Sequence, residues 1–438
     1  MVVGGGTAGA RLAQRLPVTL LGEEPHAPYN RVLLADVLAG RYGAEVIALP
    51  GTREPARLGV RAVRIDRAAR TVACADGSLV GYDRLVLATG SSPVLPPLRG
   101  LRGAEPPSGV HPFRTLDDCL ALRAVVRPGV RAAVIGGGLL GVSAARALAA
   151  LGAEVALLQQ GEHLMEHQLD PTSSALLRDH LAALGVEVHT ECRVSGLRQD
   201  GGRVTAVELA DGYVLDADVV ILACGVRPRV ALAREAGLDV NRGIVIDDGL
   251  RTSDPYIHAI GDCAEHRGRL YGLAGPALDQ ADVLAEILAE AAPDPRTSNG
   301  TRTDNGHRSG NGPRSGSDTV PGEHPAPAPR SGTGTDPAPR YTGTRALTRL
   351  TLGGPAADTL DLATFGETTP APGDDVVQLT DATRRAYRKV VVRGDRLVGG
   401  VLLGDLAAVG TLARTWEGDE ALPEDAPLLH LLTHDGGT

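Results

Sequence analysis

The chain has 438 residues, of which 43% are hydrophobic and 22% charged, and its formal net charge is −9. This length predicts two to four domains. Acidic and basic residues are interspersed without a basic stripe, which argues against a nucleic-acid-binding surface. No apolar run reaches the ~20 residues of a membrane helix, and no signal-peptide pattern is visible. We therefore expect a cytoplasmic protein that binds neither nucleic acid nor membrane.

The chain opens on a short apolar run, a glycine-rich turn and a helical pattern. Gly4, Gly6 and Gly9 match the G-x-G-x-x-G spacing of dinucleotide sites. The first glycine permits the tight turn, the second lets a pyrophosphate approach the backbone, and the third lets the helix pack on the strand. Only three residues precede Gly4, whereas a strand usually has about five or six. We therefore expect either a shortened first strand or a start codon further upstream.

The same pattern recurs at Gly136, Gly138 and Gly141. Both copies follow an apolar strand and open a helix rich in small residues, so that the helix N-terminus faces the phosphates. Strand-like runs alternate with helical patterns up to about residue 292, which predicts parallel sheets with crossover helices. Two copies in this context indicate two dinucleotide-binding domains rather than structural glycine turns.

The end of the second strand in each unit is where an acidic residue reads the ribose. In the first unit Glu23 is the favoured residue and Glu24 the alternative. In the second unit Gln159 stands there, and it neither binds a 2′-hydroxyl as a carboxylate does nor repels a 2′-phosphate. No arginine beside it clamps a 2′-phosphate. The sequence at this position therefore allows either NADH or NADPH as the bound nucleotide and favours NADH slightly.

The composition changes between residues 293 and 342, where Val320 and Tyr341 are the only large apolar residues. Such a segment buries too little surface to offset the entropy of ordering, so we expect a disordered linker. It serves either as an inert insertion or as a tether that lets the next domain swing. Beyond it, YRKVVVRGDRLVGG predicts a β-hairpin turning at Gly394 and Asp395, within a small α+β domain.

Three further stretches resemble the pyridine nucleotide–disulfide oxidoreductase superfamily of flavoprotein reductases. They are LVLATGSSP, ILACGVRP and LRTSDPYIHAIGDCAE, and they occur in the order of that superfamily. The resemblance covers residues 1–292 and implies two Rossmann-like domains of the glutathione-reductase type, with FAD at the first glycine motif and NADH or NADPH at the second. The implied organisation is an FAD domain (1–110 and 243–292), an NAD(P)H domain (111–242), the linker (293–342) and an α+β domain (343–438).

The resemblance also implies the cofactor contacts. For FAD they are Gly4, Gly6, Thr7, Ala8, Gly9, Glu23, Arg31, Ala88, Thr89, Gly90, Gly261, Asp262 and Leu273. For NAD(P)H they are Gly136, Gly138, Leu139, Leu140, Gly141, Gln159 and Gly225. In this scheme Arg31 lies near the pyrophosphate, Asp262 binds the ribityl chain, and a turn at Leu273–Pro276 approaches the flavin ring. No catalytic residue is assigned, because a hydride step requires no side-chain acid or base.

GEEPHAPYNRVLLADVLAG and HLMEHQLD, among other stretches, resemble the N-terminal flavoprotein part of the large subunit of assimilatory NAD(P)H nitrite reductases. Rubredoxin and ferredoxin reductases of the same branch are more distant relatives. Many relatives carry a glutamate just after the second glycine motif and a lysine near flavin N5, where this chain has Ser143 and Asp36. Nitrite reductases also carry cysteine-rich iron–sulfur and siroheme segments. The five cysteines here form no close pair, so we expect no metal site or redox disulfide.

These observations predict an FAD-dependent NAD(P)H oxidoreductase that passes electrons to a separate acceptor. The expected acceptor is an iron–sulfur or heme protein, with a component of nitrate or nitrite reductase as the candidate. One alternative is an oxidoreductase with a small acceptor such as oxygen, a quinone or a dye. Another is a non-enzymatic flavin-binding module with a decayed nicotinamide site, suggested by Ser143, Asp36 and Gln159.

Overall fold

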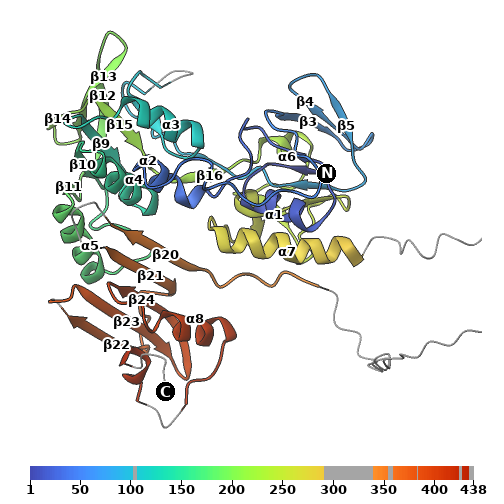
Figure 1. Cartoon of the computed structure of the whole chain (residues 1–438). Coiled ribbons are helices and arrows are strands. Elements are labelled where there is room, and N and C mark those ends of the chain that lie inside the picture. The colour runs from blue at the N-terminus through green and yellow to red at the C-terminus, as the bar shows by residue number, and fades with distance from the viewer. Residues whose placement is uncertain (102–105, 291–338, 354–358, 382, 424–426, 434–438) are drawn as a thin grey trace, which may run out of the picture.

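The computed structural model describes residues 1–101, 106–290, 339–353, 359–381, 383–423 and 427–433. Two α/β units lie side by side, and an antiparallel β unit with short helices packs against them (Figure 1). This architecture confirms the predicted fold class of two Rossmann-like domains with a small C-terminal α+β domain. Within the described residues, no helix combines the length and the apolarity that crossing a membrane requires.

The first α/β unit is built on a short parallel sheet. Its strands, in spatial order, are β18 (Ile257–Ala259), β6 (Leu85–Leu87), β1 (Val2–Val3) and β2 (Leu20–Leu21). Although β1 has only two residues, it lies inside the sheet, because Val2 pairs with Leu20 on one side and Val86 on the other. Helix α1 (Thr7–Arg15) leads from β1 to β2 and packs against α7 (Ala274–Glu290).

Smaller elements complete this unit. They are the meander β3 (Ala62–Asp66), β4 (Thr71–Cys74) and β5 (Leu79–Gly81), the pair β17 (Ile244–Ile246) and β19 (Ala264–His266), the short helices η1 (Arg31–Leu33), α2 (Leu34–Leu38), α6 (Ala231–Glu235) and η2 (Gly261–Cys263), and the two-stranded crossing of β7 (Ser91–Pro93) with β16 (Val226–Pro228). At this antiparallel pair of β7 and β16, here called the crossing, the chain passes between the two α/β units.

The second α/β unit has a longer parallel sheet. Its strands, in spatial order, are β11 (Val186–His189), β10 (Glu154–Leu158), β9 (Arg131–Ile135), β15 (Val219–Leu222) and β8 (Val110–Pro112). The helices are α3 (Leu116–Val125), α4 (Leu139–Ala150) and α5 (Pro171–Ala183), and an antiparallel sheet is formed by β12 (Val194–Asp200), β13 (Arg203–Leu209) and β14 (Val214–Asp216). Strand β9 is buried over four of its five residues, as expected of a central parallel strand.

The C-terminal unit is a five-stranded antiparallel sheet. Its strands, in spatial order, are β20 (Leu347–Leu352), β21 (Leu360–Gly366), β24 (Arg396–Leu403), β23 (Ala386–Arg393) and β22 (Asp375–Asp381), with helices α8 (Val409–Gly418) and α9 (His430–Thr433). The predicted hairpin is confirmed, since Arg393 pairs with Arg396 across Gly394 and Asp395. Gly394 has a φ of +61°, a conformation that glycine adopts without a Cβ penalty.

Two local expectations are corrected. Most of the predicted linker, residues 293–338, lies outside the described residues. Its end does not fit a disordered segment, because Tyr341 is 2% exposed, its backbone N–H donates to the Asp248 carbonyl at 2.8 Å, and its ring lies 4.9 Å from that of His266. In the turn expected at Leu273–Pro276, the last three residues form the start of α7, where a proline is tolerated because the N–H groups there have no intrahelical partner.

Candidate cofactor sites

The first glycine of each motif combines a positive φ with a close approach to another part of the backbone. Gly4 and Gly136 have φ values of +119° and +111°. A Cβ at Gly4 would lie 2.0 Å from the Ala88 carbonyl oxygen, and one at Gly136 would lie 2.4 Å from that of Ala223. Both positions therefore require glycine, for conformation and for space.

The third glycine of each motif lets the helix close onto the loop. A Cβ at Gly9 would lie 2.0 Å from the Gly4 carbonyl oxygen, and one at Gly141 would lie 1.8 Å from that of Gly136. These contacts fix the starts of α1 and α4 against the ends of β1 and β9. The close helix–strand packing expected from the sequence is present at both loops.

The second glycine of each motif faces open space. Gly6 and Gly138 are the N-caps of α1 and α4, and no heavy atom lies within 4 Å of a Cβ placed at either residue. Thr7 and Ala8, and Leu139 and Leu140, begin the two helices behind them. Backbone N–H groups at a helix N-terminus attract phosphate oxygens, so both cradles fit a dinucleotide pyrophosphate.

The segment after β6 lies against the first loop. The Ala88 N–H donates to the Val3 carbonyl at 2.8 Å, and Gly90, at a φ of +70°, has open space around its Cβ position. The Thr89 hydroxyl donates to the Arg229 carbonyl at 2.7 Å. This segment therefore joins the first glycine loop to the crossing between the two α/β units.

Gly261 and Asp262 meet the same loop from β18. A Cβ at Gly261 would lie 3.1 Å from the Ala8 Cβ. The Asp262 carboxylate accepts from Arg114 Nη2 at 2.6 Å and from the Ser91 hydroxyl at 2.8 Å. The structure thus gathers most of the predicted FAD residues at one edge of the first sheet, while their contact with the cofactor stays a prediction.

Both candidate ribose-reading acids of the first unit are ion-paired. Glu23 accepts from Arg229 Nη1 at 2.6 Å, and Glu24 pairs with Arg31 and accepts from the Tyr29 hydroxyl, the latter at 2.6 Å. Burial is the main cause that raises the pKa of Tyr29 far above its usual value. Arg31, expected near the pyrophosphate, is thus held by Glu24 and by the Tyr29 hydroxyl.

The sequence reasoning missed the two arginines that neutralise Asp262 and Glu23. Arg114 follows β8 and Arg229 follows β16, so both lie where the chain passes between the two α/β units. Arg229 directly follows the ILACGVRP stretch, and its place beside that motif was the only feature of the sequence that could have indicated a role for it.

In the second unit, Gln159 binds the glycine loop. Its Oε1 accepts from the Gly137 N–H at 2.8 Å. Gly225, also predicted to contact the nucleotide, has a φ of +93° with open space at its Cβ position. Gln159 therefore stiffens the loop with its carbonyl oxygen.

Ser143 and Asp36, which stand where many relatives have a glutamate and a lysine, make other contacts in this structure. The Ser143 hydroxyl donates to the Leu139 carbonyl of its own helix at 2.8 Å. Asp36 in α2 accepts a hydrogen bond from Arg146 Nη2 at 2.7 Å. Arg146 lies on α4, three residues after Ser143. The Arg146 side chain is 2% exposed. The two units are thus joined by an ion pair whose acidic member stands on α2 and whose basic member stands on α4.

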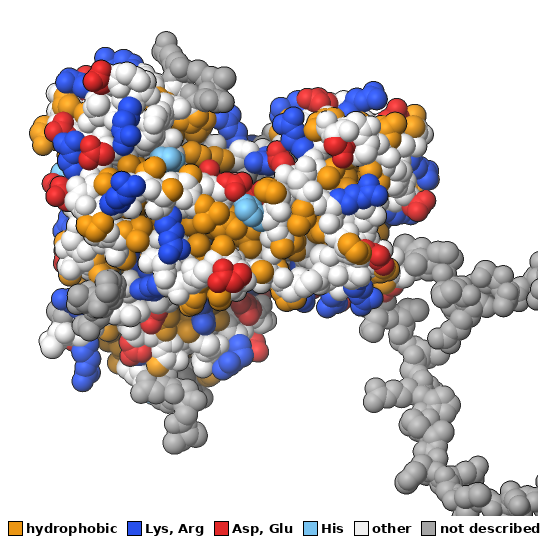
Figure 2. Space-filling view, turned by 45° about the horizontal axis from the view of Figure 1, so that its top comes forward, with side chains coloured by type: hydrophobic (Ala, Val, Ile, Leu, Met, Phe, Trp, Pro, Cys, Tyr) orange, Lys and Arg blue, Asp and Glu red, His pale blue; other side chains and the backbone are white. Residues whose placement is uncertain are grey.

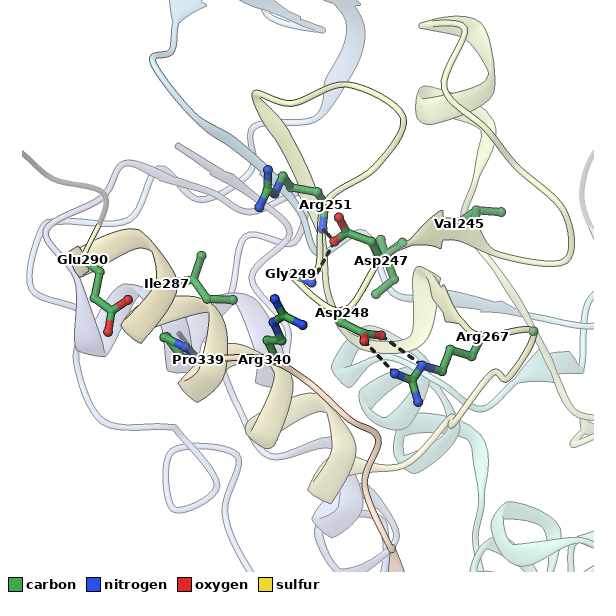
Figure 3. A pocket seen from close by; sticks show the side chains of 12 residues that line it. Val245, Asp247, Asp248, Gly249, Arg251, Arg267, Ile287, Glu290, Pro339 and Arg340 are labelled. Atoms are coloured by element: carbon green, nitrogen blue, oxygen red, sulfur yellow. Dashed lines mark hydrogen bonds and ion pairs between the residues drawn. The ribbon is translucent and has the colours of Figure 1, made fainter. Parts of the chain in front are cut away.

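A cavity of about 610 Å³ lies elsewhere on the first unit (Figure 3). Its lining includes Asp247, Asp248, Arg251, Arg267, Glu290 and Arg340. Asp248 pairs with Arg267 Nη2 at 2.6 Å, one of the interactions drawn in Figure 3. No predicted cofactor residue lines this cavity, so it is separate from both glycine loops.

Residues 1–281 match the family described as pyridine nucleotide-disulphide oxidoreductase, and residues 357–417 match the rubredoxin NAD+ reductase C-terminal domain. The chain belongs to the pyridine nucleotide-disulphide oxidoreductase family. The predicted superfamily, the enzyme class and the cofactor pair of FAD with NADH or NADPH are confirmed.

Curated relatives include the nitrite reductase [NAD(P)H] of Bacillus subtilis, 30% identical over 454 residues that cover 100% of this chain and 50% of the relative. The rubredoxin-NAD(+) reductase of Pseudomonas putida is 33% identical over a region that covers 62% of this chain and 73% of that reductase. Among solved structures, putidaredoxin reductase covalently joined to putidaredoxin matches with a TM-score of 0.76 and 25% identity, covering 98% of this chain and 97% of that one. The chain spans half or less of the nitrite reductases it matches over its whole length.

Proposed function

We propose that this protein oxidises NADH or NADPH bound at the second glycine loop and passes the electrons, through FAD at the first loop, to a separate redox protein. The observation that carries the proposal is the pair of loops with the same three glycine constraints, one on each parallel sheet. The residues of the first loop, among them Gly4, Gly6 and Gly9, would hold FAD, which would supply the capacity to accept a hydride from the nicotinamide and to pass its electrons to the acceptor. The proposal includes the expected cofactor contacts and domain limits, except that β16 and α6 belong with the first unit, against which they pack.

The chain's own residues bind and orient the reactants. The open positions at Gly6 and Gly138 admit the two pyrophosphates, and α1 and α4 direct their N-termini at them. The Arg229 N–H donates to the Gly90 carbonyl at 2.9 Å, and β7 pairs with β16. These backbone bonds hold the end of the first sheet against the returning strand of the second unit, so the relative position of the two sites is set by the fold.

We propose an iron–sulfur or heme protein of nitrate or nitrite assimilation as the acceptor. The assimilatory nitrate reductase electron transfer subunit of Bacillus subtilis supports this, being 35% identical over 302 residues. Hydrophobic side chains gather near the middle of the face shown in Figure 2, between its two lobes. Apolar surface of this kind suits a protein partner.

The cytoplasm is the compartment we propose. All five cysteines are free thiols, which a reducing compartment preserves.

An anaerobic titration tests the proposal. The purified protein is reconstituted with FAD and titrated with NADH and separately with NADPH, while the visible flavin absorbance is followed. We expect bleaching with at least one nucleotide, and then recovery of the flavin absorbance when oxidised rubredoxin or a [2Fe–2S] ferredoxin is added. A flavin that stays oxidised with both nucleotides contradicts the proposal and supports a non-enzymatic module. Reoxidation by oxygen or a quinone alone supports the small-acceptor alternative.

A further inference from the structure

The segment that follows β10 folds back onto the second glycine loop. Gln159 binds the Gly137 N–H, and the Met165 N–H donates to the Gly137 carbonyl at 2.9 Å. Met165 has a φ of +52° and is 1% exposed, so the backbone turns sharply there around a buried side chain. The next residue, Glu166, is thereby carried back toward the start of the segment.

The Glu166 carboxylate lies over the chain just beyond the end of β10. Its Oε1 accepts from the Glu162 N–H at 3.0 Å, and its Oε2 accepts from Gln159 Nε2 at 3.4 Å. A Cβ at Gly161 would lie 2.0 Å from Oε1, so any larger residue there would require the Glu166 side chain to move. The absence of a side chain at Gly161 thus accommodates the carboxylate in this position.

This carboxylate lies beside Gln159, which stands at the position where a dinucleotide fold distinguishes its two nucleotides. An acidic side chain at the end of the second strand binds the ribose 2′-hydroxyl of NADH and repels the 2′-phosphate of NADPH. Gln159 stands at that position in sequence without a charge. Residues 159–170 contain no arginine or lysine that could bind a 2′-phosphate. Glu166 restores a negative charge beside Gln159 from seven residues further along the chain.

We infer that Glu166 is the residue that makes this protein select NADH over NADPH. The carboxylate accepts a hydrogen bond from the ribose hydroxyl and disfavours a phosphate group at the same place. The inference rests on the proposed binding of the nicotinamide nucleotide at the second loop. Because Glu166 is exposed and its partners belong to its own segment, the fold does not depend on its charge.

The test compares kcat/KM for NADH and for NADPH in flavin reduction by the FAD-loaded full-length protein. Glu166→Gln keeps the size and the acceptor oxygen, and Glu162→Gln removes one charge from the same exposed segment as the matched control. We expect the wild type to prefer NADH, Glu166→Gln to reduce that preference about tenfold, mainly through a lower KM for NADPH, and Glu162→Gln to keep it.

Three outcomes overturn the inference: a wild type without preference for NADH, an unchanged preference in Glu166→Gln, or an equal loss in Glu162→Gln. Calorimetric titration of the same proteins with NAD+ and NADP+ separates this inference from the proposed function. If the flavin is not reduced but NAD+ binds more tightly than NADP+ only while Glu166 is present, the function is wrong and the selectivity assignment holds. Equal binding of both nucleotides overturns the assignment.

Discussion

Two arginines at the passage between the α/β units balance the carboxylates of the first unit. Arg114 and Asp262 are 24% and 18% exposed, whereas Arg229 and Glu23 are 41% and 47% exposed. Ion pairs in open solvent contribute little because water screens them, so the Arg114–Asp262 pair is the stronger of the two. It orients the Asp262 carboxylate, which the resemblance places at the ribityl chain, and ties that residue to the start of the second unit.

A buried histidine makes the first unit sensitive to acid. His258 in β18 is 3% exposed, and its Nδ1 has no hydrogen-bond partner among the described residues. Burial, assisted by Arg251 and Arg84, lowers the pKa of His258 to about 4. The unfolded chain binds this proton more tightly than the folded one, so the free energy of unfolding falls as the pH drops from about 6.5 to about 4, by about 3 kcal/mol in total.

Urea unfolding at pH 7 and at pH 4.5 checks this prediction. We expect the loss of stability between the two pH values to be smaller in His258→Leu than in the wild type. His167→Leu, which replaces an exposed histidine, serves as the control and should keep the wild-type loss. An equal pH dependence of His258→Leu and the wild type would show that His258 does not bind the destabilising proton.

At the scale of elements, the sequence predicted the features whose backbone geometry only one residue type can adopt. The glycine loops are predictable because the backbone at Gly4 and Gly136 has a positive φ and leaves no room for a Cβ atom. The start of α7 at Ala274 was not, since Gly275 and Pro276 occur both in turns and in first helical turns. The position of Glu166 also escaped prediction, because it depends on how the segment after β10 folds back.

A buried ion pair between Lys389 and Asp170 is one of the contacts that dock the C-terminal sheet. Lys389 in β23 donates to Asp170 at 2.8 Å, and the Tyr387 hydroxyl donates to the same oxygen at 2.6 Å. Asp170 also caps α5 by accepting from the Ser173 N–H at 2.9 Å. Burial by itself raises the pKa of Asp170, but the hydrogen bonds from Lys389, Tyr387 and Ser173 outweigh it and lower the pKa to about 2.

Substitution of Lys389 tests this docking. Lys389→Met leaves a partly buried carboxylate without its cation, and we expect the free energy of unfolding to fall by about 3 kcal/mol. The additional change Asp170→Asn should recover part of the loss, because the amide oxygen still caps α5 and carries no charge. Arg384→Met is the control, since its ion pair is on the surface, and it should change the urea midpoint little. Equal midpoints for Lys389→Met and Arg384→Met would contradict the role of the pair.

At the scale of the molecule, a single guanidinium touches all three units. Arg146 in α4 of the second unit donates to Asp36 of the first at 2.7 Å and to the Gly353 carbonyl of the C-terminal unit at 3.2 Å. The sequence predicted each unit from its own local pattern. It could not predict their arrangement, because these contacts join residues 110 and 207 positions apart, whose meeting depends on the complete fold.

The central claim is that one chain holds two different dinucleotides in a fixed order, FAD at the first loop and the nicotinamide nucleotide at the second. Gly6→Val and Gly138→Val test it as a matched pair, because each valine fills an open position at a φ of −75° or −77° that it adopts without strain. The decisive measurement is the FAD content of each purified variant, followed by anaerobic titration with NADH. We predict that Gly6→Val loses FAD, whereas Gly138→Val keeps FAD that NADH no longer bleaches. Loss of FAD from Gly138→Val with retention by Gly6→Val, or normal bleaching in both, would contradict the account.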